Sequence, residues 1–342
     1  MSRDEAYRAL LEAVNRGIEG LDVASALGEA AAPEVAPAGA EEEGRGETAT
    51  RLFVTGVPRS GTTLLYQLLC ASGALGWVSN VAARFYRNPA FGAGVQELLR
   101  PLLADPVPVF TSEYGRTGSW AAPHEFGFYW SRHLPFDDSH EPTAEELEEV
   151  DWTEVERELA GLSGVLGRPL VFKNNILACV TPALGAHLPG ALFLELRRDP
   201  ADVAHSILRA RRVEVGGESA WWSTRVRGWR ALQERPPVEQ IVEQIARIDA
   251  AHDRARAALG ATRWRVVSYE ELCRDPRGTV GAALAWAGVD GVGELERLPE
   301  RFEPSRPRPE PALASLAGLL AERGVRQGER RADEGRPGPP AG

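Results

Sequence analysis

A glycine-rich loop between an apolar run and a helical pattern is the first place where this sequence could do chemistry. Residues 51–55, RLFVT, lead into GVPRSGTT at 56–63, and the helical pattern LLYQLL follows. Backbone N–H groups at the start of a helix, together with the hydroxyls of Ser60, Thr62 and Thr63, favour an anionic group, and glycine allows its close approach. The spacing G-x-x-x-x-G alone is equally compatible with an ordinary strand, turn and helix.

The loop lacks the lysine of loops that bind nucleoside triphosphates. Those loops read G-x-x-x-x-G-K-[ST], and this chain has Thr62 directly after Gly61, in the place of the lysine. Arg59, three residues earlier, supplies a fixed positive charge instead. No acidic residue that would hold Mg²⁺ beside a triphosphate is evident. We therefore expect a phosphate-type anion bound without metal, and a P-loop small-molecule kinase is the alternative.

The composition is that of an acidic globular protein. The chain has 342 residues, 43% of them hydrophobic, and a formal net charge of −10. Because no basic stripe offsets that charge, we expect no nucleic-acid partner. No apolar run reaches the roughly 18 residues of a membrane span, and the first residues are acidic where a secretory signal would be basic. We therefore expect a cytoplasmic protein without membrane contact.

The three cysteines, Cys70, Cys179 and Cys273, are far apart in the sequence. Neither a C-x-x-C pair nor another metal-ligand spacing occurs, so we expect no metal site and no redox motif. Buried thiols in a reducing compartment are the interpretation we favour.

The chain divides by composition into three parts. Residues 1–49 combine a short helix, predicted from the capping pattern Ser2-Arg3-Asp4-Glu5, with a flexible linker rich in Ala, Pro and Glu. Residues 50–328 are predicted to form the folded domain. The tail, residues 329–342, is predicted to be disordered.

Apolar runs and helical patterns alternate through the folded domain. Strands are predicted at 51–55, 170–173, 191–196 and 263–268. Helices are predicted at 62–72 and 238–259, and Asp199-Pro200 begins another, with Asp as the cap and Pro in the first turn. This alternation predicts an α/β fold: a doubly wound, P-loop-like, mainly parallel sheet with helices on both faces.

One edge of the predicted sheet collects residues suited to an anion. Ligands of parallel sheets bind at the carboxyl ends of the strands. That rule places four separate parts of the sequence on one rim: residues 56–63, Lys173, Arg197-Arg198 and Tyr269.

Two motifs give the chain a resemblance to a known family. GVPRSGTTLL, which begins at Gly56, resembles the 5′-phosphosulfate loop of sulfotransferases that use 3′-phosphoadenosine-5′-phosphosulfate (PAPS), in the arginine-bearing version of bacterial and protein-tyrosine members. LFLELRRDPADVAHSIL, residues 192–208, resembles their 3′-phosphate segment, with Arg198 and Ser206 at the matching positions. The planar guanidinium of Arg198 suits a phosphate dianion, and Ser206, about two turns into the helix, offers a hydroxyl.

Two further positions agree with this resemblance, which spans roughly residues 51–290. VVSYEELCRDP places Tyr269 where relatives have a tyrosine that contacts adenine. LVFKNN places Lys173 where relatives have a strand that ends in lysine before the acceptor pocket.

The chain also departs from the family pattern at three places. Cytosolic members carry Trp after the two threonines, where this chain has Leu64. Their C-terminal Arg-Lys-Gly clamp has only a weak counterpart in Arg326-Gln327-Gly328. Their catalytic histidine follows the lysine-bearing strand, and here that place reads Asn174-Asn175.

The general base must therefore lie elsewhere in the sequence. Residues 115–130, GRTGSWAAPHEFGFYW, place His124 and Glu125 among aromatic residues and glycines. Sulfuryl transfer to an alcohol needs a group that accepts the hydroxyl proton, and since some relatives use glutamate, the resemblance implies Glu125 first and His124 second. If Pro123 starts a helix, the two side chains point about 100° apart. Asn80 is a weaker candidate for the same pocket.

The resemblance implies a PAPS-dependent sulfotransferase that uses no metal and releases 3′-phosphoadenosine-5′-phosphate (PAP). Arg59 and Lys173 would offset developing charge, and residues 60–63 would cradle the 5′ end of the donor. The implied acceptor is a hydroxyl of a carbohydrate or a small natural product, and the oligomeric state stays open. A kinase, or a module that binds PAP without chemistry, are the alternatives.

Overall fold

The computed structural model describes residues 3–19, 21, 50–100, 110, 119–289 and 294–325. The predicted N-terminal helix is present as α1, Arg3–Ile18, while Ser2 of the predicted capping pattern lies outside the described residues. The predicted linker, the tail and Arg326-Gln327-Gly328 also lie outside them. None of the described helices is long and apolar enough to cross a membrane.

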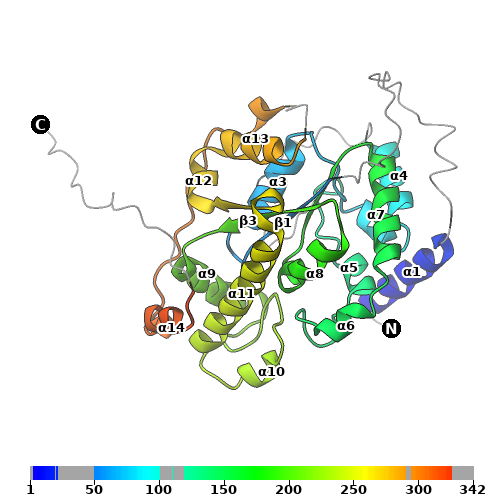
Figure 1. The fold of residues 1–342 in the computed structure, drawn as a ribbon. Helices are drawn as coiled ribbons and strands as arrows, with labels where there is room; N and C mark the ends of the chain where they lie inside the picture. Colours follow the sequence, from blue (N-terminus) through cyan, green and yellow to red (C-terminus); the bar gives the residue numbers. More distant parts are fainter. Residues whose placement is uncertain are drawn as a thin grey trace, which may run out of the picture.

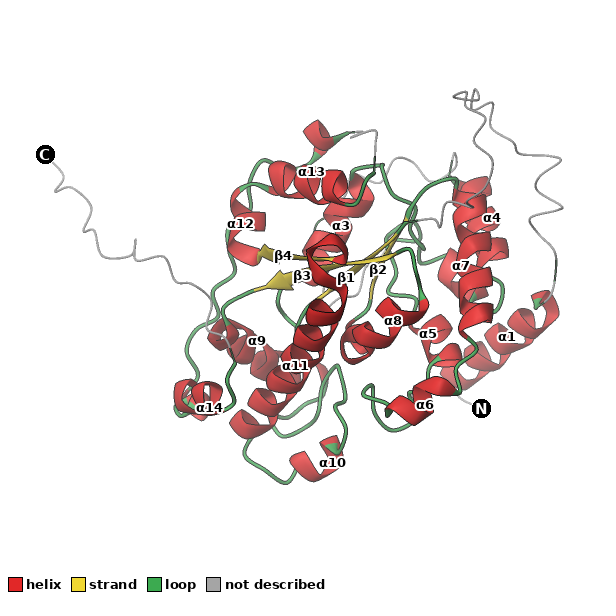
Figure 2. Cartoon of the chain, viewed as in Figure 1, coloured by secondary structure: helices red, strands yellow, loops and turns green. Residues whose placement is uncertain are grey.

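A four-stranded parallel sheet forms the centre of the molecule (Figures 1 and 2). Its strands are β1 (Arg51–Thr55), β2 (Leu170–Lys173), β3 (Ala191–Arg197) and β4 (Trp264–Ser268). They lie side by side in the order β2-β1-β3-β4, and each neighbouring pair is parallel. The predicted α/β fold is confirmed, and the strand bounds agree with the prediction to within one residue.

Helices follow or precede each strand and cover the sheet. The longer ones are α3 (Thr62–Ala71), α4 (Pro89–Leu99), α7 (Trp152–Leu166), α9 (Pro200–Glu214), α11 (Pro237–Arg263) and α13 (Pro276–Trp286). The shorter ones are α5 (Gly127–His133), α6 (Ala144–Glu148), α8 (Thr181–His187), α10 (Trp229–Leu232), α12 (Tyr269–Arg274) and α14 (Leu316–Glu322). Short 3₁₀ helices include η1 (Ala82–Phe85) and η2 (Asn175–Val180).

The two faces of the sheet bury different residues because successive strand side chains point to opposite sides. On β1, Leu52 and Val54 pack into a cluster with the apolar side chains of α3, α12 and α13. Phe53 faces the other way, where its ring stacks on Phe172 at 5.4 Å and on Phe193 at 5.5 Å. That second cluster includes side chains of α5, α7 and α8, and helices therefore cover both faces, as predicted (Figure 1).

Helix α9 begins as the sequence predicts, whereas α11 extends beyond its prediction. The carboxylate of Asp199 accepts hydrogen bonds from the first N–H groups of α9, and Pro200 stands in its first turn. Helix α11 runs four residues past the predicted end at Leu259, although Gly260, with φ 66°, interrupts its regular geometry. The left-handed glycine marks the predicted end, and a further short turn follows it before β4.

Candidate active site

The carboxyl ends of all four strands carry the residues that the sequence singled out. Strand β1 leads into the loop 56–61, β2 ends in Lys173, β3 ends at Arg197 beside Arg198, and β4 leads into Tyr269. The parallel arrangement places these ends on one rim, as we expected.

At two positions of the loop 56–61, the surrounding atoms leave no room for a side chain. Gly61 has φ 102°, and a Cβ atom there would lie 2.6 Å from Cδ2 of Tyr269. A Cβ atom on Gly56 would lie 2.6 Å from Oγ of Ser60 and 2.7 Å from the carbonyl oxygen of Leu196. Arg59 is itself left-handed, with φ 74°. A non-glycine residue held in that region costs about 1–3 kcal/mol and is found mostly at functional sites.

The N-terminus of α3 is built to receive an anion. Gly61 precedes the helix, no side chain caps it, and no acidic residue stands in its first turn. The first N–H groups of a helix carry partial positive charge. Beside them, Oγ of Ser60 is buried without a hydrogen-bond partner, and a buried unpaired hydroxyl costs free energy. An anionic ligand oxygen would accept hydrogen bonds from the first N–H groups of α3 and from the hydroxyl of Ser60.

The two predicted phosphate-binding segments meet at this loop. Nε of Arg59 donates to Oγ of Ser206 over 3.0 Å, and Nη1 of Arg198 donates to the carbonyl oxygen of Arg59 over 3.1 Å. The guanidinium of Arg198 lies over the ring of Tyr269, 4.6 Å from its centre. The side chain of Arg198 is 5% exposed, and its Nε has no partner. The structure therefore links four predicted donor-binding residues in one chain of contacts, from Ser206 through Arg59 and Arg198 to Tyr269.

A segment that sequence reasoning missed closes over these residues. Residues 299–310 have no regular secondary structure and precede α14 in the chain, and the carbonyl oxygen of Ser305 accepts from Nη2 of Arg198. The N–H of Ser305 donates to the Tyr269 hydroxyl over 3.1 Å. Further along, the N–H of Glu310 donates to Nδ1 of His205 over 3.2 Å. We call residues 299–310 the C-terminal strap. No local signal in its sequence points to these distant partners.

The predicted catalytic groups meet at the end of β2. Nζ of Lys173 donates to Oε1 of Glu125, and the two side chains are 2% and 31% exposed. The side-chain amide of Asn174 donates to the carbonyl oxygen of Glu125 over 2.9 Å. Glu125 is therefore held through both its carboxylate and its backbone.

The conditional prediction of a helix at Pro123 is wrong. Pro123 pairs instead with Ser79 in an isolated antiparallel bridge, and α5 begins only at Gly127. Asn80 stabilises this pairing, since its N–H donates to the carbonyl oxygen of Ala122 over 2.9 Å and its amide donates to that of Ser119 over 2.7 Å. The helix fails to form because these long-range backbone bonds hold the segment extended.

His124 and Glu125 consequently differ in their surroundings more than the sequence suggests. Nδ1 of His124 accepts a hydrogen bond of 2.8 Å from the N–H of Phe126. Burial lowers the pKa of His124, while the neighbouring Glu125 carboxylate raises it, and the net direction is down. His124 is thus a neutral imidazole at pH 7, with its acceptor nitrogen occupied and its proton on Nε2.

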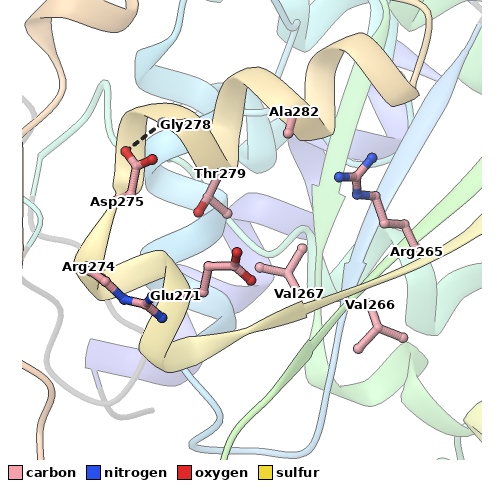
Figure 3. Close-up of a pocket in the computed structure, with 9 residues that line it drawn as sticks. All are labelled: Arg265, Val266, Val267, Glu271, Arg274, Asp275, Gly278, Thr279 and Ala282. Atoms are coloured by element: carbon pink, nitrogen blue, oxygen red, sulfur yellow. Dashed lines mark hydrogen bonds between the residues drawn. The ribbon is translucent and has the colours of Figure 1, made fainter.

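A separate hollow of about 390 Å³ lies between β4, α12 and α13 (Figure 3). Arg265 and Val266 line it from the strand, and Glu271, Asp275 and Thr279 from the helices. None of the predicted site residues lines it, and Asp275 uses its carboxylate to cap α13 at the N–H of Gly278. We therefore place the candidate active site at the rim and not in this hollow.

Comparisons with known proteins agree with the fold and its motifs. A model described as "Sulfotransferase family" matches residues 51–292. The sulfotransferase STF9 of Mycobacterium avium has a TM-score of 0.52 at 17% identity, over 80% of this chain and 76% of that one. The sulfotransferase STF1 of Mycobacterium tuberculosis has a TM-score of 0.52 at 21% identity, over 81% of this chain and 76% of that one. At such identities these two structures show the fold alone.

None of the curated proteins compared with the chain matches it. The family model, in contrast, spans well over half of the sequence and includes the loop 56–61, residues 192–208 and Tyr269. The chain therefore belongs to the sulfotransferase family.

Proposed function

We propose that this protein transfers a sulfuryl group from PAPS to a hydroxyl group of a small acceptor. The observation that carries the proposal is the contact between Arg59 and Ser206, with Arg198 bonded to the same loop. The contact between Arg59 and Ser206 joins the segment predicted to hold the 5′ end of the donor to the segment predicted to hold its 3′-phosphate. A kinase needs no second phosphate site at this position.

The residues at the rim suit a nucleotide that carries anionic groups at two places, its 5′ end and its 3′-phosphate. Oγ of Ser60 and Nε of Arg198 are both buried without partners, so each has a hydrogen bond to give. Gly56 and Gly61 keep the loop free of side chains at its tightest points. Ser60 and the first residues of α3, Thr62 and Thr63, would hold the 5′ end, and Tyr269, which packs against Arg198, would contact adenine.

The chemistry that the donor supplies is a sulfur–oxygen bond to a good leaving group. The acceptor oxygen forms a new bond to sulfur, the bond from sulfur to the 5′-phosphate oxygen breaks, and PAP leaves. Glu125 takes the hydroxyl proton. His124 is the weaker candidate because its Nδ1 lone pair already accepts from Phe126 and burial lowers its pKa.

Arg59 and Lys173 supply the positive charge that such a transfer needs. Lys173 is buried and stands at the end of β2, directly beside Val54 in the sheet register, so its ammonium group reaches the rim from the strand next to the loop. Preorganised cations and backbone dipoles at the developing charge are usually the largest catalytic contribution. We assign Arg59 to the bridging oxygen, with Lys173 assisting.

The acceptor side favours a ring-bearing molecule. Trp120 and Phe128, on either side of Glu125 in the sequence, are 68% and 59% exposed. Exposed aromatic faces stack on phenols and on sugar rings, so a carbohydrate or a small natural product with a hydroxyl is the acceptor class that we propose.

Binding of PAP tests the donor assignment directly. A ligand at 100 times its Kd stabilises the folded state by about 2.7 kcal/mol, which a thermal-shift titration detects. We expect a larger shift with PAP than with ADP, because ADP lacks the 3′-phosphate. A shift with ATP–Mg²⁺ and none with PAP would favour the kinase. PAP binding without any transfer from PAPS would favour the non-catalytic module.

A further inference from the structure

Asn174 is placed to control the position of the candidate base. It follows Lys173 directly, it is buried, and its backbone continues the extended geometry of β2 with φ −153° and ψ 127°. Its side-chain amide donates to the carbonyl oxygen of Glu125 over 2.9 Å. Two consecutive residues thus hold Glu125, Lys173 at the carboxylate and Asn174 at the backbone.

The orientation of the Asn174 amide is fixed by its second contact. Oδ1 accepts a hydrogen bond of 3.0 Å from the N–H of Ile176, which makes Asn174 the cap of η2. Because a backbone N–H can only donate, the atom facing it must be the oxygen, and the nitrogen must face Glu125. Both halves of the amide are used, so the side chain cannot turn away without losing a bond.

The backbone next to Glu125 needs such support. Phe126 is left-handed, with φ 55° and ψ 38°, and it is fully buried with its ring stacked on Tyr129 at 4.7 Å. A bulky residue in that region is strained and persists only where its surroundings enforce it. The bond from Asn174 fixes the carbonyl that immediately precedes this strained residue. It therefore sets the direction in which the Glu125 side chain leaves the backbone.

We propose that Asn174 is a positioning residue for Glu125 in the proposed transfer reaction. Its amide holds the backbone of Glu125 at the distance from Lys173 and the loop at which the carboxylate can accept the acceptor proton. A misplacement of about 1 Å in a reacting group can cost roughly 10²-fold in rate. This inference rests on the proposed function, since it assigns Asn174 a task only if Glu125 is the base.

The decisive variant is Asn174→Asp, which separates the two contacts of the amide. Asp still caps η2 by accepting from the N–H of Ile176, but it cannot donate to the carbonyl oxygen of Glu125. We expect kcat to fall roughly 10- to 100-fold, with the Kd of PAP within about twofold of the wild type. Asn174→Ala should show the same kinetic loss and an additional loss of stability.

Asn88 provides a matched control. Its buried side chain also caps a helix with its oxygen and donates with its amide nitrogen to distant carbonyl groups. Its amide donates to the carbonyl oxygens of Ile18 and Leu21, and its Oδ1 accepts from the N–H of Phe91. Asn88→Ala should lower the Tm by roughly 2–4 °C, as expected for a lost cap, and leave kcat unchanged. The assay measures PAP released from PAPS with 2-naphthol or octyl glucoside as the acceptor, and with water alone.

A double-mutant cycle decides whether Asn174 acts through Glu125. In a Glu125→Gln background the further change Asn174→Asp should cost less than about twofold, because the group that it positions is already disabled. An undiminished loss in that background, or a wild-type kcat for Asn174→Asp, would overturn the positioning role while the proposed function stands. Wild-type protein that releases no PAP from PAPS with either acceptor or with water would overturn both.

Discussion

Arg59 illustrates how one residue connects the two halves of the proposed donor site. Its backbone is left-handed, its carbonyl oxygen accepts from Arg198, and its Nε donates to Ser206. The side chain therefore starts from the loop and ends on α9. A lysine in its place would present a single ammonium group, whereas the planar guanidinium carries five N–H donors in a fixed fork.

Removal of the Arg59 side chain should affect turnover more than binding. Arg59→Ala should lower kcat roughly 10²-fold or more, because a preorganised cation at the developing charge is lost. The Kd of PAP should change less, since Arg198, Ser206 and the helix N-terminus remain. Steady-state kinetics with PAPS and a PAP titration measure the two quantities, and Arg209→Ala, an exposed arginine on α9, is the control. Near-normal turnover in Arg59→Ala would contradict the role assigned here.

Residues in short local motifs could be predicted from the sequence, and residues that act through distant contacts could not. Arg59, Arg198 and Ser206 each belong to a contiguous pattern, and the structure places them in contact. Ser305 has no such pattern, because its role depends on the path of the chain after α13. In the sequence, Asn174 was notable only because Asn174-Asn175 stands where relatives have a catalytic histidine. The positioning role that we propose for it comes from its hydrogen bonds in the structure.

At the scale of elements, the strands were predictable because each is a short buried apolar run. The segment 119–126 was not, because backbone bonds to residues 78–81 and the amide of Asn174 determine its shape. A helix from Pro123 was left open by the sequence, and the long-range pairing with Ser79 is what forms instead. Because this pairing is not visible in the local sequence, the different surroundings of Glu125 and His124 could not be predicted from it.

The C-terminal strap should loosen when its bond to α12 is removed. Tyr269→Phe retains the ring beneath Gly61 and the contact with Arg198, but it deletes the hydroxyl that accepts from the N–H of Ser305. The loss of one hydrogen bond should accelerate exchange of that amide roughly fivefold. Hydrogen–deuterium exchange of residues 301–306 measures it, with the amides of α13 as the internal control. Unchanged exchange at Ser305 would show that other contacts hold the strap.

At the scale of the whole molecule, a buried histidine that can bind a proton packs against the central sheet. His252 on α11 is fully buried, and its Nε2 lies 2.9 Å from Oγ1 of Thr55, the last residue of β1. Its Nδ1 lies 3.9 Å from Oε1 of Glu195. Burial lowers the pKa of His252 from 6.5 to about 4. Burial likewise lowers the pKa of His140 to about 4, with the nearby Arg225 adding to the shift.

The protein should therefore lose stability in mild acid. Above pH 6.5 both histidines are neutral in the folded and unfolded states, and the stability is complete. Below pH 6.5 the unfolded chain binds protons that the folded chain excludes, so the free energy of unfolding falls until about pH 4. A shift of this size corresponds to about 3 kcal/mol for His252.

Urea unfolding at pH values from 4 to 8 measures this loss. His252→Gln, whose amide can still meet Thr55, should show a visibly shallower decline, while the remaining decline belongs to His140 and to surface groups. Equal slopes for the variant and the wild type would mean that His252 does not exclude the proton in the folded state.

The fold class followed from the alternation of patterns, but the strand order did not. Every strand is a short apolar run, and nothing in Leu170–Lys173 or Ala191–Arg197 says which one borders β1 on which side. The order is decided by how the connecting helices pack against each face, which is a property of the assembled core.

The central place of β1 has a consequence for the synthesis of the protein. Strand β1 is the first of the described strands to be made, yet both of its neighbours, β2 and β3, begin only at Leu170 and Ala191. A ribosome that adds roughly 10 residues per second leaves β1 without a partner for about ten seconds. During that time Leu52, Phe53 and Val54, all buried in the finished fold, stay exposed on the nascent chain. Among the described strands, the one that leads into the proposed nucleotide loop is thus the one most dependent on protection from aggregation during translation.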